Sequence, residues 1–395
     1  MEYQLHVDQT WPPTDSSLGL REGVLLPPDK LDDPETIEFS GQHTVATPGW
    51  FNSHAHLELS NCSVKEYNGD FVDWIFDVLE HKESQDNEDI KQAFLNGCES
   101  LVQSGICHVV DHCDRTDQVL EVVDETGIDV HLFKELIGFF SDEIDEQESL
   151  GRKFLERASN GKTRAGLAPH APYSAHPEVY QRCEELLEEY DGAISSHMHE
   201  IQMELEFTEL GSGRFSELIE ERSGETPETP YVDRPIPFFV REQYFSKPVF
   251  GIHLNYLNDR DYRWLESSSI APVFCPRSYR HFGHDTLPVV EWYKRDIDFA
   301  MGTDSTASDT KLDLLNELRV LEDLTEIEIE PETILKSLTE VPSRVLGIPD
   351  RGVLSYGTPA DISIFNVPSG DLEDLARGQA EALAVIRDGE IVWSE

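Results

Sequence analysis

Two histidines stand one residue apart in the segment PGWFNSHAHLELS (48–60), directly after a turn-forming Pro-Gly. Because side chains alternate faces along a strand, we expect His54 and His56 to project from the same face. Two neutral imidazoles make a poor core contact, since each ring has two nitrogens to satisfy, but they make half of a metal site. The alternative is two unrelated polar histidines at a strand end, so the pair needs partners elsewhere in the chain.

Two later segments offer such partners. The segment SSHMHEIQMELEF (195–207) contains His197 and His199 followed by Glu200, and Asp304 stands in MGTDS. A catalytic Zn²⁺ needs about three protein ligands and an open position for water. Since His197 and His199 would share a strand face, their positions alone do not decide between them. A metal held by this set would make hydroxide available near neutral pH, so hydrolysis is the chemistry we expect.

The elements that position these residues repeat along the chain. From residue 50 to about residue 305, a short apolar run ends in a polar residue and a helical stretch rich in Asp, Glu and Leu follows. Eight such units predict an α/β fold, a (β/α)₈ TIM barrel whose active site lies at the carboxyl ends of the strands. The predicted strands are residues 47–56, 105–112, 127–135, 163–170, 192–199, 247–253, 269–275 and 297–304.

Nearly every predicted strand ends in a side chain that can bind a metal or move a proton. A sheet built only for stability has no reason for this pattern. The residues at these ends are His54, His56, His112, Glu135, His170, His197, His253, Cys275 and Asp304. No lysine ends the fourth strand, so a carbamylated lysine that bridges two metals is not available there, which favours a single metal.

The two ends of the chain differ from the middle. Residues 1–47 and 350–395 contain short alternating strands, with an Asp-Gly hairpin signal at 388–389, and we expect them to form one small β-sandwich. Residues 48–349 would then be the catalytic barrel. A Pro-rich stretch at 223–237 is a candidate lid or substrate-contact loop.

The composition limits the class of protein. The chain of 395 residues has 31 Lys and Arg against 78 Asp and Glu, a net charge of −47, which argues against nucleic acid and anionic membranes as partners. Carboxylates spread so evenly predict adaptation to a salty cytosol, with a merely acidic protein as the alternative. The six scattered cysteines contain no CxxC, and the amino terminus lacks a signal-peptide pattern, so we expect a cytoplasmic protein with reduced thiols.

Together, these motifs resemble the amidohydrolase superfamily, and within it the aminohydrolase and chlorohydrolase branch. Besides the first histidine segment, the matching stretches are PHAPYSAHPE, HMHEIQMELEF, GIHL, APVFCPRSYRHFG and MGTDSTAS, which span most of the chain from 48 to 320. The resemblance implies that His54, His56, His197 and Asp304 hold one divalent metal ion, with zinc favoured and iron as the alternative.

The resemblance also implies roles for other residues. Glu200 matches a glutamate that shuttles protons, and His253 matches a histidine that orients the water or the leaving group. Asp304 takes a proton from the water as well as binding metal, and His170 matches a substrate-contacting histidine. The spacing to Glu200 selects His197 as the ligand, which makes His199 a loop residue beside the site.

Some details are similar to the aminofutalosine deaminase group, which acts on an adenine-type nucleoside in a menaquinone route. These are Glu58 in HLELS, the segment GDFVDWIFDVLEHK (69–82) and CPRSYRHFG. The chain departs from that group at His81-Lys82, where an arginine is expected, and at Tyr279, where an asparagine is expected. These departures concern the substrate, not the chemistry.

Three further side chains have two interpretations each. We interpret Phe71 and Trp74 as a core-facing stripe of a helix, with a role in the site as the alternative. Arg277 either contacts a substrate oxygen, since arginine suits anion recognition, or forms a surface ion pair.

The sequence therefore predicts a metal-dependent deaminase of a purine-nucleoside-like or other N-heterocyclic small molecule, which releases ammonia. One alternative is a hydrolase of another C–N or C–Cl bond at the same site. A second is a catalytically silent metal-binding barrel, which the presence of both Glu200 and Asp304 disfavours. A small-molecule substrate is the expected partner, and a homodimer is possible on this interpretation.

Overall fold

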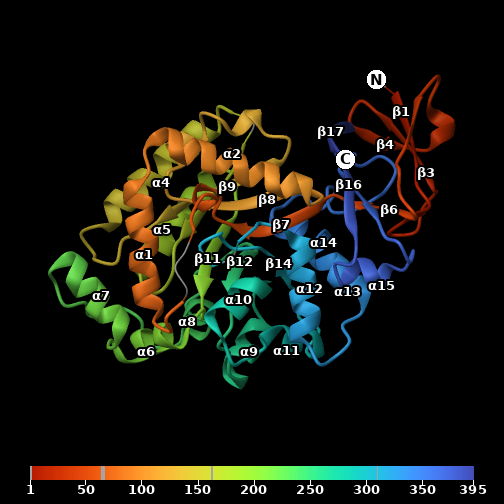
Figure 1. The fold of residues 1–395 in the computed structure, drawn as a ribbon. Helices are drawn as coiled ribbons and strands as arrows, with labels where there is room; N and C mark the ends of the chain where they lie inside the picture. Colours follow the sequence, from red (N-terminus) through yellow and green to blue (C-terminus); the bar gives the residue numbers. More distant parts are fainter. Residues whose placement is uncertain (1, 64–66, 162, 309) are drawn as a thin grey trace.

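The computed structural model describes residues 2–63, 67–161, 163–308 and 310–395, and its centre is a barrel surrounded by helices (Figure 1). Eight strands are paired in chain order, and each neighbouring pair is parallel. The strands are β7 (Trp50–Ala55), β8 (Ile106–Cys113), β9 (Asp129–Leu136), β10 (Arg164–Pro169), β11 (Ile194–Met198), β12 (Val249–His253), β13 (Ile270–Phe274) and β14 (Ala300–Met301). The predicted (β/α)₈ fold is confirmed, with each strand inside or within one residue of its expected range.

The barrel closes where the last strand meets the first. Ala55 and Asp304 form a parallel bridge, and the carbonyl oxygen of His54 accepts hydrogen bonds from the backbone N–H groups of Thr303 and Asp304, each at 3.0 Å. This closure brings the first histidine pair beside Asp304, which follows β14, although His54 and Asp304 are 250 residues apart in the chain.

Helices connect the strands and cover the barrel (Figure 1). The helix α2, for example, starts with a capping box, in which Asp86 and Asp89 each accept a hydrogen bond from the other's backbone N–H group. The helices are α1 (Phe71–Ser84), α2 (Asn87–Gln103), α3 (Thr116–Val119), α4 (Ile144–Ala158), α5 (Pro177–Glu189), α6 (Gln202–Leu210), α7 (Arg214–Ser223), α8 (Pro235–Arg241), α9 (Asp259–Leu265), α10 (Pro276–Phe282), α11 (Pro288–Lys294), α12 (Leu314–Leu324), α13 (Pro331–Ser337), α14 (Glu340–Val345) and α15 (Leu372–Ala376).

The two ends of the chain meet in two small sheets beside the barrel (Figure 1). One apolar core lies between the sheets. Leu5 and Leu20 belong to one sheet, and Ile362 and Ile386 belong to the other. The strands are β1 (Glu2–His6), β3 (Ser17–Arg21), β4 (Val24–Leu26) and β5 (Glu35–Glu38), and then β2 (Gln9–Thr10), β6 (Thr44–Pro48), β15 (Ile362–Asn366), β16 (Glu381–Arg387) and β17 (Glu390–Ser394). The domain boundaries at 47/48 and 349/350 remain predictions.

The predicted Asp-Gly hairpin is present. Asp388 and Gly389 both have positive φ, 47° and 74°, and they join the antiparallel strands β16 and β17. Glycine and aspartate tolerate this left-handed conformation better than most residues, which is why the dipeptide signals such a turn.

A buried polar network joins the amino-terminal end of the barrel to the terminal sheets. The imidazole of His108 lies 3.4 Å from Asp129 on β9 and 3.2 Å from Asp361, which precedes β15, and His131 lies 3.5 Å away. Arg351 forms a second ion pair with Asp361 at 2.5 Å. Burial disfavours the charge on His108, but its hydrogen bonds to the two carboxylates outweigh burial and raise its pKa.

The cysteines and the helices can be compared with the sequence-based expectations of reduced thiols and of no membrane-spanning segment. All six cysteines are buried as free thiols. Among the described residues, every helix is too short or too polar to cross a lipid bilayer.

Candidate active site

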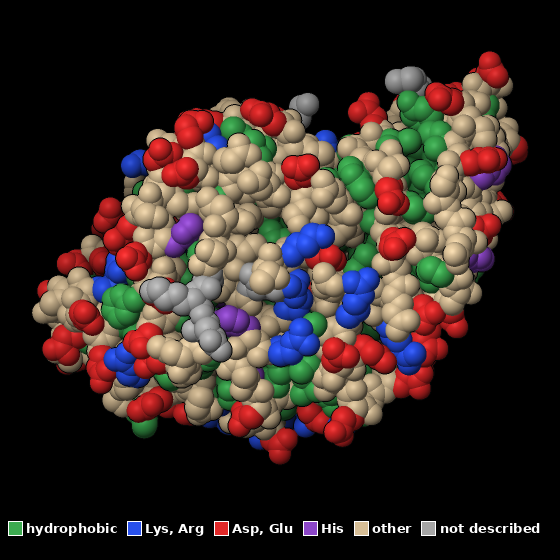
Figure 2. Space-filling view, viewed as in Figure 1, with side chains coloured by type: hydrophobic (Ala, Val, Ile, Leu, Met, Phe, Trp, Pro, Cys, Tyr) green, Lys and Arg blue, Asp and Glu red, His purple; other side chains and the backbone are tan. Residues whose placement is uncertain are grey.

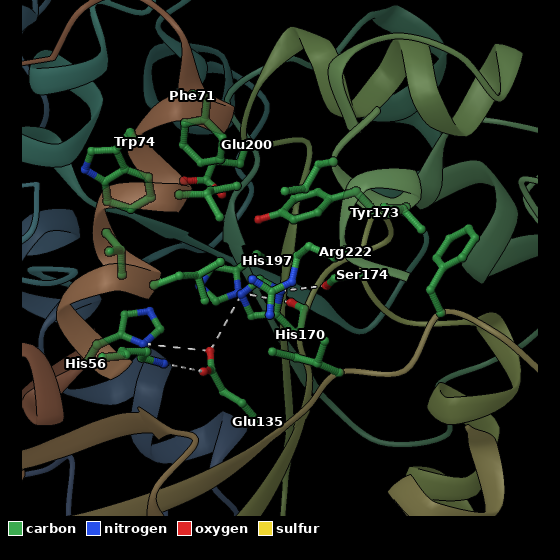
Figure 3. A pocket seen from close by; sticks show the side chains of 18 of the residues that line it. His56, Phe71, Trp74, Glu135, His170, Tyr173, Ser174, His197, Glu200 and Arg222 are labelled. Carbon is green, nitrogen blue, oxygen red and sulfur yellow. Dashed lines mark hydrogen bonds and ion pairs between the residues drawn. The ribbon is translucent and has the colours of Figure 1, made fainter. Parts of the chain in front are cut away.

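A cavity of about 460 Å³ opens at the carboxyl ends of the barrel strands. Its base contains the predicted histidines and acids, and its walls come from α1, from the segment between β9 and α4, and from α7 (Figure 3). Arg214 at the start of α7 holds two of these walls together, since its guanidinium bonds Asp70 at 3.0 Å and Asp73 at 3.1 Å, and Asp70 caps α1. A volume of this size suits a small-molecule ligand.

Four histidines and an aspartate converge at the base of the cavity. One ligand nitrogen from each of His54, His56, His112 and His197 lies within 4.8 Å of the others. Asp304 adds an oxygen that is 3.6 Å from Nε2 of His54 and 3.9 Å from Nε2 of His56. The structure thus brings together the four predicted ligands, and it adds His112.

The donor atoms of this cluster fit a divalent cation. Both ring nitrogens of His54 and of His112, and Nδ1 of His56, are buried without a hydrogen-bond partner among the described residues. His197 donates its Nδ1–H to the carbonyl oxygen of His170 at 3.0 Å, which turns its Nε2 toward the cluster. Burial also lowers the pKa values of His54, His112 and His197, so these rings stay neutral as metal ligands must. A buried imidazole left without a partner is costly, and a bound cation would remove that cost.

Asp304 is held in an unusual backbone conformation. Its φ is +59°, and one carboxylate oxygen accepts hydrogen bonds from the hydroxyl groups of Ser278 at 2.7 Å and Ser308 at 2.9 Å. The other oxygen faces the histidines. Burial disfavours its charge, but the close approach of His54 and the nearby imidazoles dominate and hold its pKa well below the usual range. Asp304 is therefore a fixed, ionised acceptor beside the cluster.

Glu200 lines the same cavity, and its surroundings favour its protonated form. Burial, and then the charges of Asp304 and Glu204, raise its pKa well above the usual range. Its carboxyl group lies 3.4 Å from Nε2 of His253, which also lines the cavity. Glu204 accepts hydrogen bonds from the backbone N–H groups of His199 and Glu200, both at 2.9 Å, and so fixes the turn that carries Glu200.

His170 belongs to a second group on the cavity wall. Its Nδ1 lies 2.7 Å from the hydroxyl of Ser174, and its Nε2 lies 3.8 Å from Glu135 (Figure 3). Glu135 also lies 3.8 Å from Nδ1 of His56 and 3.7 Å from the ammonium of Lys82. Glu135 thus lies within ion-pair distance of both the predicted substrate residue His170 and the predicted metal ligand His56.

His199 lies beside the site, as the sequence suggested. Its φ is +51°, and its ring points away from the cluster, with Nδ1 at 3.1 Å from the carbonyl of Tyr256 and Nε2 accepting from the N–H of Ile236 at 3.2 Å. Burial lowers its pKa to about 4, so the ring is a neutral connection between β11 and α8. Of the candidate lid at 223–237, only Ser223 lines the cavity, and the wall there is α7.

The predicted substrate contact of Arg277 is not supported by its position. Its side chain bonds the carbonyl of Lys311 at 2.7 Å and lies 4.0 Å from Glu317, and it does not line the cavity. The reason is local, because Pro276 begins α10 and the helix directs Arg277 toward α12. Arg277 does lie near a carboxylate, but the pair with Glu317 is largely buried and is not the surface ion pair of the alternative interpretation.

The interpretation of Phe71 and Trp74 as a core-facing stripe needs correction. Both side chains pack in an apolar cluster with Phe215 and Phe282, and both also line the cavity (Figure 3). The indole N–H of Trp74 donates to the carbonyl of Ala307 at 3.1 Å, which fixes the ring at the edge of the cavity. The two residues are therefore core and site wall together.

Sequence reasoning left four site residues out of its predicted set. His112 and Glu135 carried a signal, since both end predicted strands. Lys82 appeared only as a departure from the related group, yet it enters the cavity wall and pairs with Glu58 at 2.6 Å. Arg222, near the end of α7, had no signal in the sequence.

The barrel and the convergent histidines and acids define a metal-dependent enzyme whose site lies at the carboxyl ends of its strands. The sequence model of the amidohydrolase family matches residues 45–392. The chain belongs to the amidohydrolase family.

Several deaminases are similar to this chain over most of its length. A 5-methylthioadenosine/S-adenosylhomocysteine deaminase of Carboxydothermus hydrogenoformans is 25% identical over 387 residues, which cover 93% of this chain and 85% of that protein. An aminodeoxyfutalosine deaminase of Nitratiruptor sp. is 25% identical over 353 residues, 85% of this chain and 82% of that protein. The crystal structure of Helicobacter pylori aminofutalosine deaminase with methylthio-coformycin has a TM-score of 0.84 at 18% identity, and covers 98% of this chain and 99% of that one.

Proposed function

We propose that the protein is a hydrolytic deaminase that removes an exocyclic amino group from a purine-nucleoside-like substrate and releases ammonia. The observation that carries this proposal is the pair of acids in the cavity, Glu200 with a raised pKa and Asp304 with a lowered one, on either side of the histidine cluster. Two carboxyl groups whose environments push their pKa values apart can act as acid and base in one reaction.

The divalent cation is assigned to His54, His56, His197 and Asp304, with His112 close by. When bound, it supplies Lewis-acid chemistry and makes hydroxide available near neutral pH. Zinc is the proposed ion, because three imidazoles and one carboxylate match its usual catalytic ligands, and iron is the alternative. One ion per chain is proposed.

The side chains in the cavity then divide the proton transfers. Asp304 accepts a proton from the attacking water, and His253 orients that water, since its ring lies between Glu200 and the cluster. Glu200, protonated by its environment, donates to the ring nitrogen next to the reacting carbon. Asp304 then passes the proton it took from water to the amino group, and the C–N bond breaks as ammonia leaves with both electrons of that bond. The hydroxyl of the tetrahedral adduct returns a proton to Glu200 as it becomes the carbonyl of the product, which restores both acids.

The cavity supports a flat, largely apolar substrate. Trp74, Phe139 and Phe140 contribute aromatic walls, and His170 is placed to contact the substrate beside Ser174. The names of the sequence relatives, deaminases of 5-methylthioadenosine, S-adenosylhomocysteine and aminodeoxyfutalosine, support an adenine-type nucleoside as the substrate class.

The acidic surface supports a proposal about partners and setting. Asp and Glu side chains are scattered around the face seen in Figure 2, which also has a group of Lys and Arg side chains near its centre. Over the whole chain, 78 Asp and Glu outnumber 31 Lys and Arg. Such a surface repels nucleic acid and anionic lipid, so we propose a small molecule as the partner and a salt-rich cytoplasm as the setting. A homodimer is part of the same proposal, and light scattering after gel filtration tests it.

An ammonia-release screen tests the proposed reaction. Metal-loaded protein in high salt is incubated with adenosine, 5′-methylthioadenosine, S-adenosylhomocysteine and aminodeoxyfutalosine, with pterins and chlorinated triazines as other heterocycles. Ammonia from an adenine-type nucleoside is the expected result. Release of chloride from a triazine without ammonia from any nucleoside would favour the C–Cl alternative, and no turnover at full metal loading would favour the silent barrel.

A further inference from the structure

The wall of the cavity formed by α7 contains an arginine that no carboxylate neutralises. Arg222 is exposed and lines the cavity, and its side chain points into it (Figure 3). Among the described residues, no carboxylate oxygen lies within 4.0 Å of its guanidinium, although the chain has 78 Asp and Glu. By contrast, Arg214 on the same helix pairs with Asp70, Asp73 and Glu217.

The other charged groups of the wall are already engaged. The ammonium of Lys82 lies between the carboxylates of Glu58 and Glu135 and is neutralised by them. Glu143 lines the cavity too, but it accepts a hydrogen bond from the N–H of Phe140 at 2.9 Å and lies beyond ion-pair distance of Arg222. Within the described part of the wall, Arg222 is thus the cation that can receive an anion from outside.

The cavity between the reacting base and Arg222 is apolar. Ile75 and Val78 of α1 and Ile219 of α7 line it, together with the aromatic residues of the α1 and β9–α4 walls. A ligand that fills this space needs an amino heterocycle at the base, an apolar middle and an anionic end. Arginine binds a carboxylate with two parallel hydrogen bonds, which makes the contact selective as well as strong.

We propose that Arg222 is a specificity residue that binds a carboxylate at the end of the substrate remote from the reacting ring. The substrate class is an adenine-type nucleoside whose 5′ substituent is apolar and ends in a carboxylate. This inference rests on the proposed deaminase function. It separates two compounds in the name of one relative, because S-adenosylhomocysteine ends in an amino acid, whose carboxylate stands beside an ammonium group, and 5′-methylthioadenosine ends in a methyl group.

The test compares these two compounds in the metal-loaded protein and in the variant Arg222→Gln. The wild type is expected to have the higher kcat/KM with S-adenosylhomocysteine. The variant should lose about 10- to 100-fold in kcat/KM with that substrate, chiefly through KM, as expected for a charge-assisted hydrogen bond. Its kcat/KM with 5′-methylthioadenosine should stay within about twofold, since no bond to the methyl group is lost.

Arg263→Gln is the matched control, because Arg263 is an exposed arginine of α9 that does not line the cavity. It should leave both substrates unchanged.

Calorimetric binding of both compounds to metal-loaded protein separates the two proposals. Equal affinities in the wild type, or an equal loss for both compounds in Arg222→Gln, overturn the role of Arg222 even where both are deaminated. A preference for S-adenosylhomocysteine that Arg222→Gln abolishes, with no ammonia released from either compound, supports the carboxylate site and overturns the deaminase proposal.

Discussion

Two groups of buried histidines lie at opposite ends of the same barrel, and they differ in what surrounds each ring. At the carboxyl ends of the strands, both nitrogens of His54 lack a hydrogen-bond partner among the described residues, and its pKa is lowered. At the amino-terminal ends, the two nitrogens of His108 face Asp129 and Asp361, and its pKa is raised. The neutral form of His54, with free nitrogens, suits the binding of a metal ion, whereas the surroundings of His108 favour its protonated form.

The difference shows that proximity alone does not make a metal site. His108, Asp129 and His131 are also close enough to one another to bind an ion. However, His108 forms ion pairs with Asp129 and with Asp361 at the junction with the terminal sheets. Among the buried ring nitrogens of His108 and His131, Nδ1 of His131 is the one without a hydrogen-bond partner among the described residues. The hydrogen bonds and ion pairs of His108 distinguish this stabilising network from the proposed metal site, where both nitrogens of His54 lack hydrogen-bond partners.

Metal content gives the largest expected contrast between the two ends. The wild-type protein should carry close to one transition-metal ion per chain. Replacing His54 and His56 by Ala together should abolish binding, because two of the proposed ligands are removed. His108→Asn should keep the ion. Elemental analysis after gentle purification checks this, and two tightly held ions per chain, or none, would contradict the assignment.

The next largest effect is expected from the loss of proton transfer by Glu200 in the cavity at the carboxyl ends of the strands. Glu200→Gln should keep the metal and lose about 10²–10⁴-fold in kcat, the usual contribution of a positioned acid or base. Steady-state kinetics with metal-loaded variant, after elemental analysis of the same sample, measure this loss. A variant that works near the wild-type rate would move the role to Glu204, whose pKa is raised to about 7.

The free energy of unfolding is expected to depend on the His108 network at the amino-terminal ends of the barrel strands. His108→Asn should lower the free energy of unfolding by about 1.5–3 kcal/mol near pH 6, because it removes a charged hydrogen-bond partner from Asp361, which keeps Arg351, and from the partly buried Asp129. A raised folded-state pKa contributes stability below the unfolded value, and that stability is lost as pH rises through the folded value. The difference in the free energy of unfolding between wild type and variant should therefore shrink as pH rises above about 6.5, the unfolded histidine value.

The carboxylates of the same network have the opposite dependence on pH. The pKa of Asp361 is lowered to about 2, because the interactions with His108 and Arg351 outweigh burial. Its contribution is present above the unfolded value and is lost as pH falls toward 2. Denaturant unfolding at several pH values measures both limbs, and a wild-type minus variant difference that does not change with pH would contradict the charged network.

Salt concentration should have the smallest effect on the difference between wild type and His108→Asn. The Debye length falls from about 30 Å at 0.01 M to about 3 Å at 1 M, so KCl should raise the Tm of the wild type by screening its −47 charge. The difference in Tm between wild type and His108→Asn should change little, because buried pairs are screened less. Thermal melts at about 0.05 M and about 2 M KCl, at constant metal, test this. An unchanged wild-type Tm would contradict the halophile proposal.

The barrel was predictable because its signal is local and repeated. Each strand is an apolar run with a polar end, and a parallel barrel places all such ends on one face. That rule alone collects His54, His197, His253 and Asp304, which come from four separate strands. Even β14, which has two residues, was found from the motif that follows it.

The walls of the cavity were not predictable in the same way. Arg277 follows a strand, but the helix that starts at Pro276 turns it away from the cavity. Lys82 reaches Glu58 and Glu135 only after α1 packs over the barrel, and Arg222 depends on how α7 packs against α1. These positions follow from packing between distant segments, which neither spacing nor periodicity records.

The backbone of the active end has a consequence for how the protein can evolve. His253 and Asp304 have φ values of +73° and +59°, and such residues typically cost of order 1–3 kcal/mol each. Selection for heat resistance alone would favour glycine or a relaxed turn at these strand ends, and would remove the catalytic side chains with the strain. Thermostable variants that stay active should therefore carry their changes elsewhere, in the terminal sheets and the outer helices, where stability and activity do not compete.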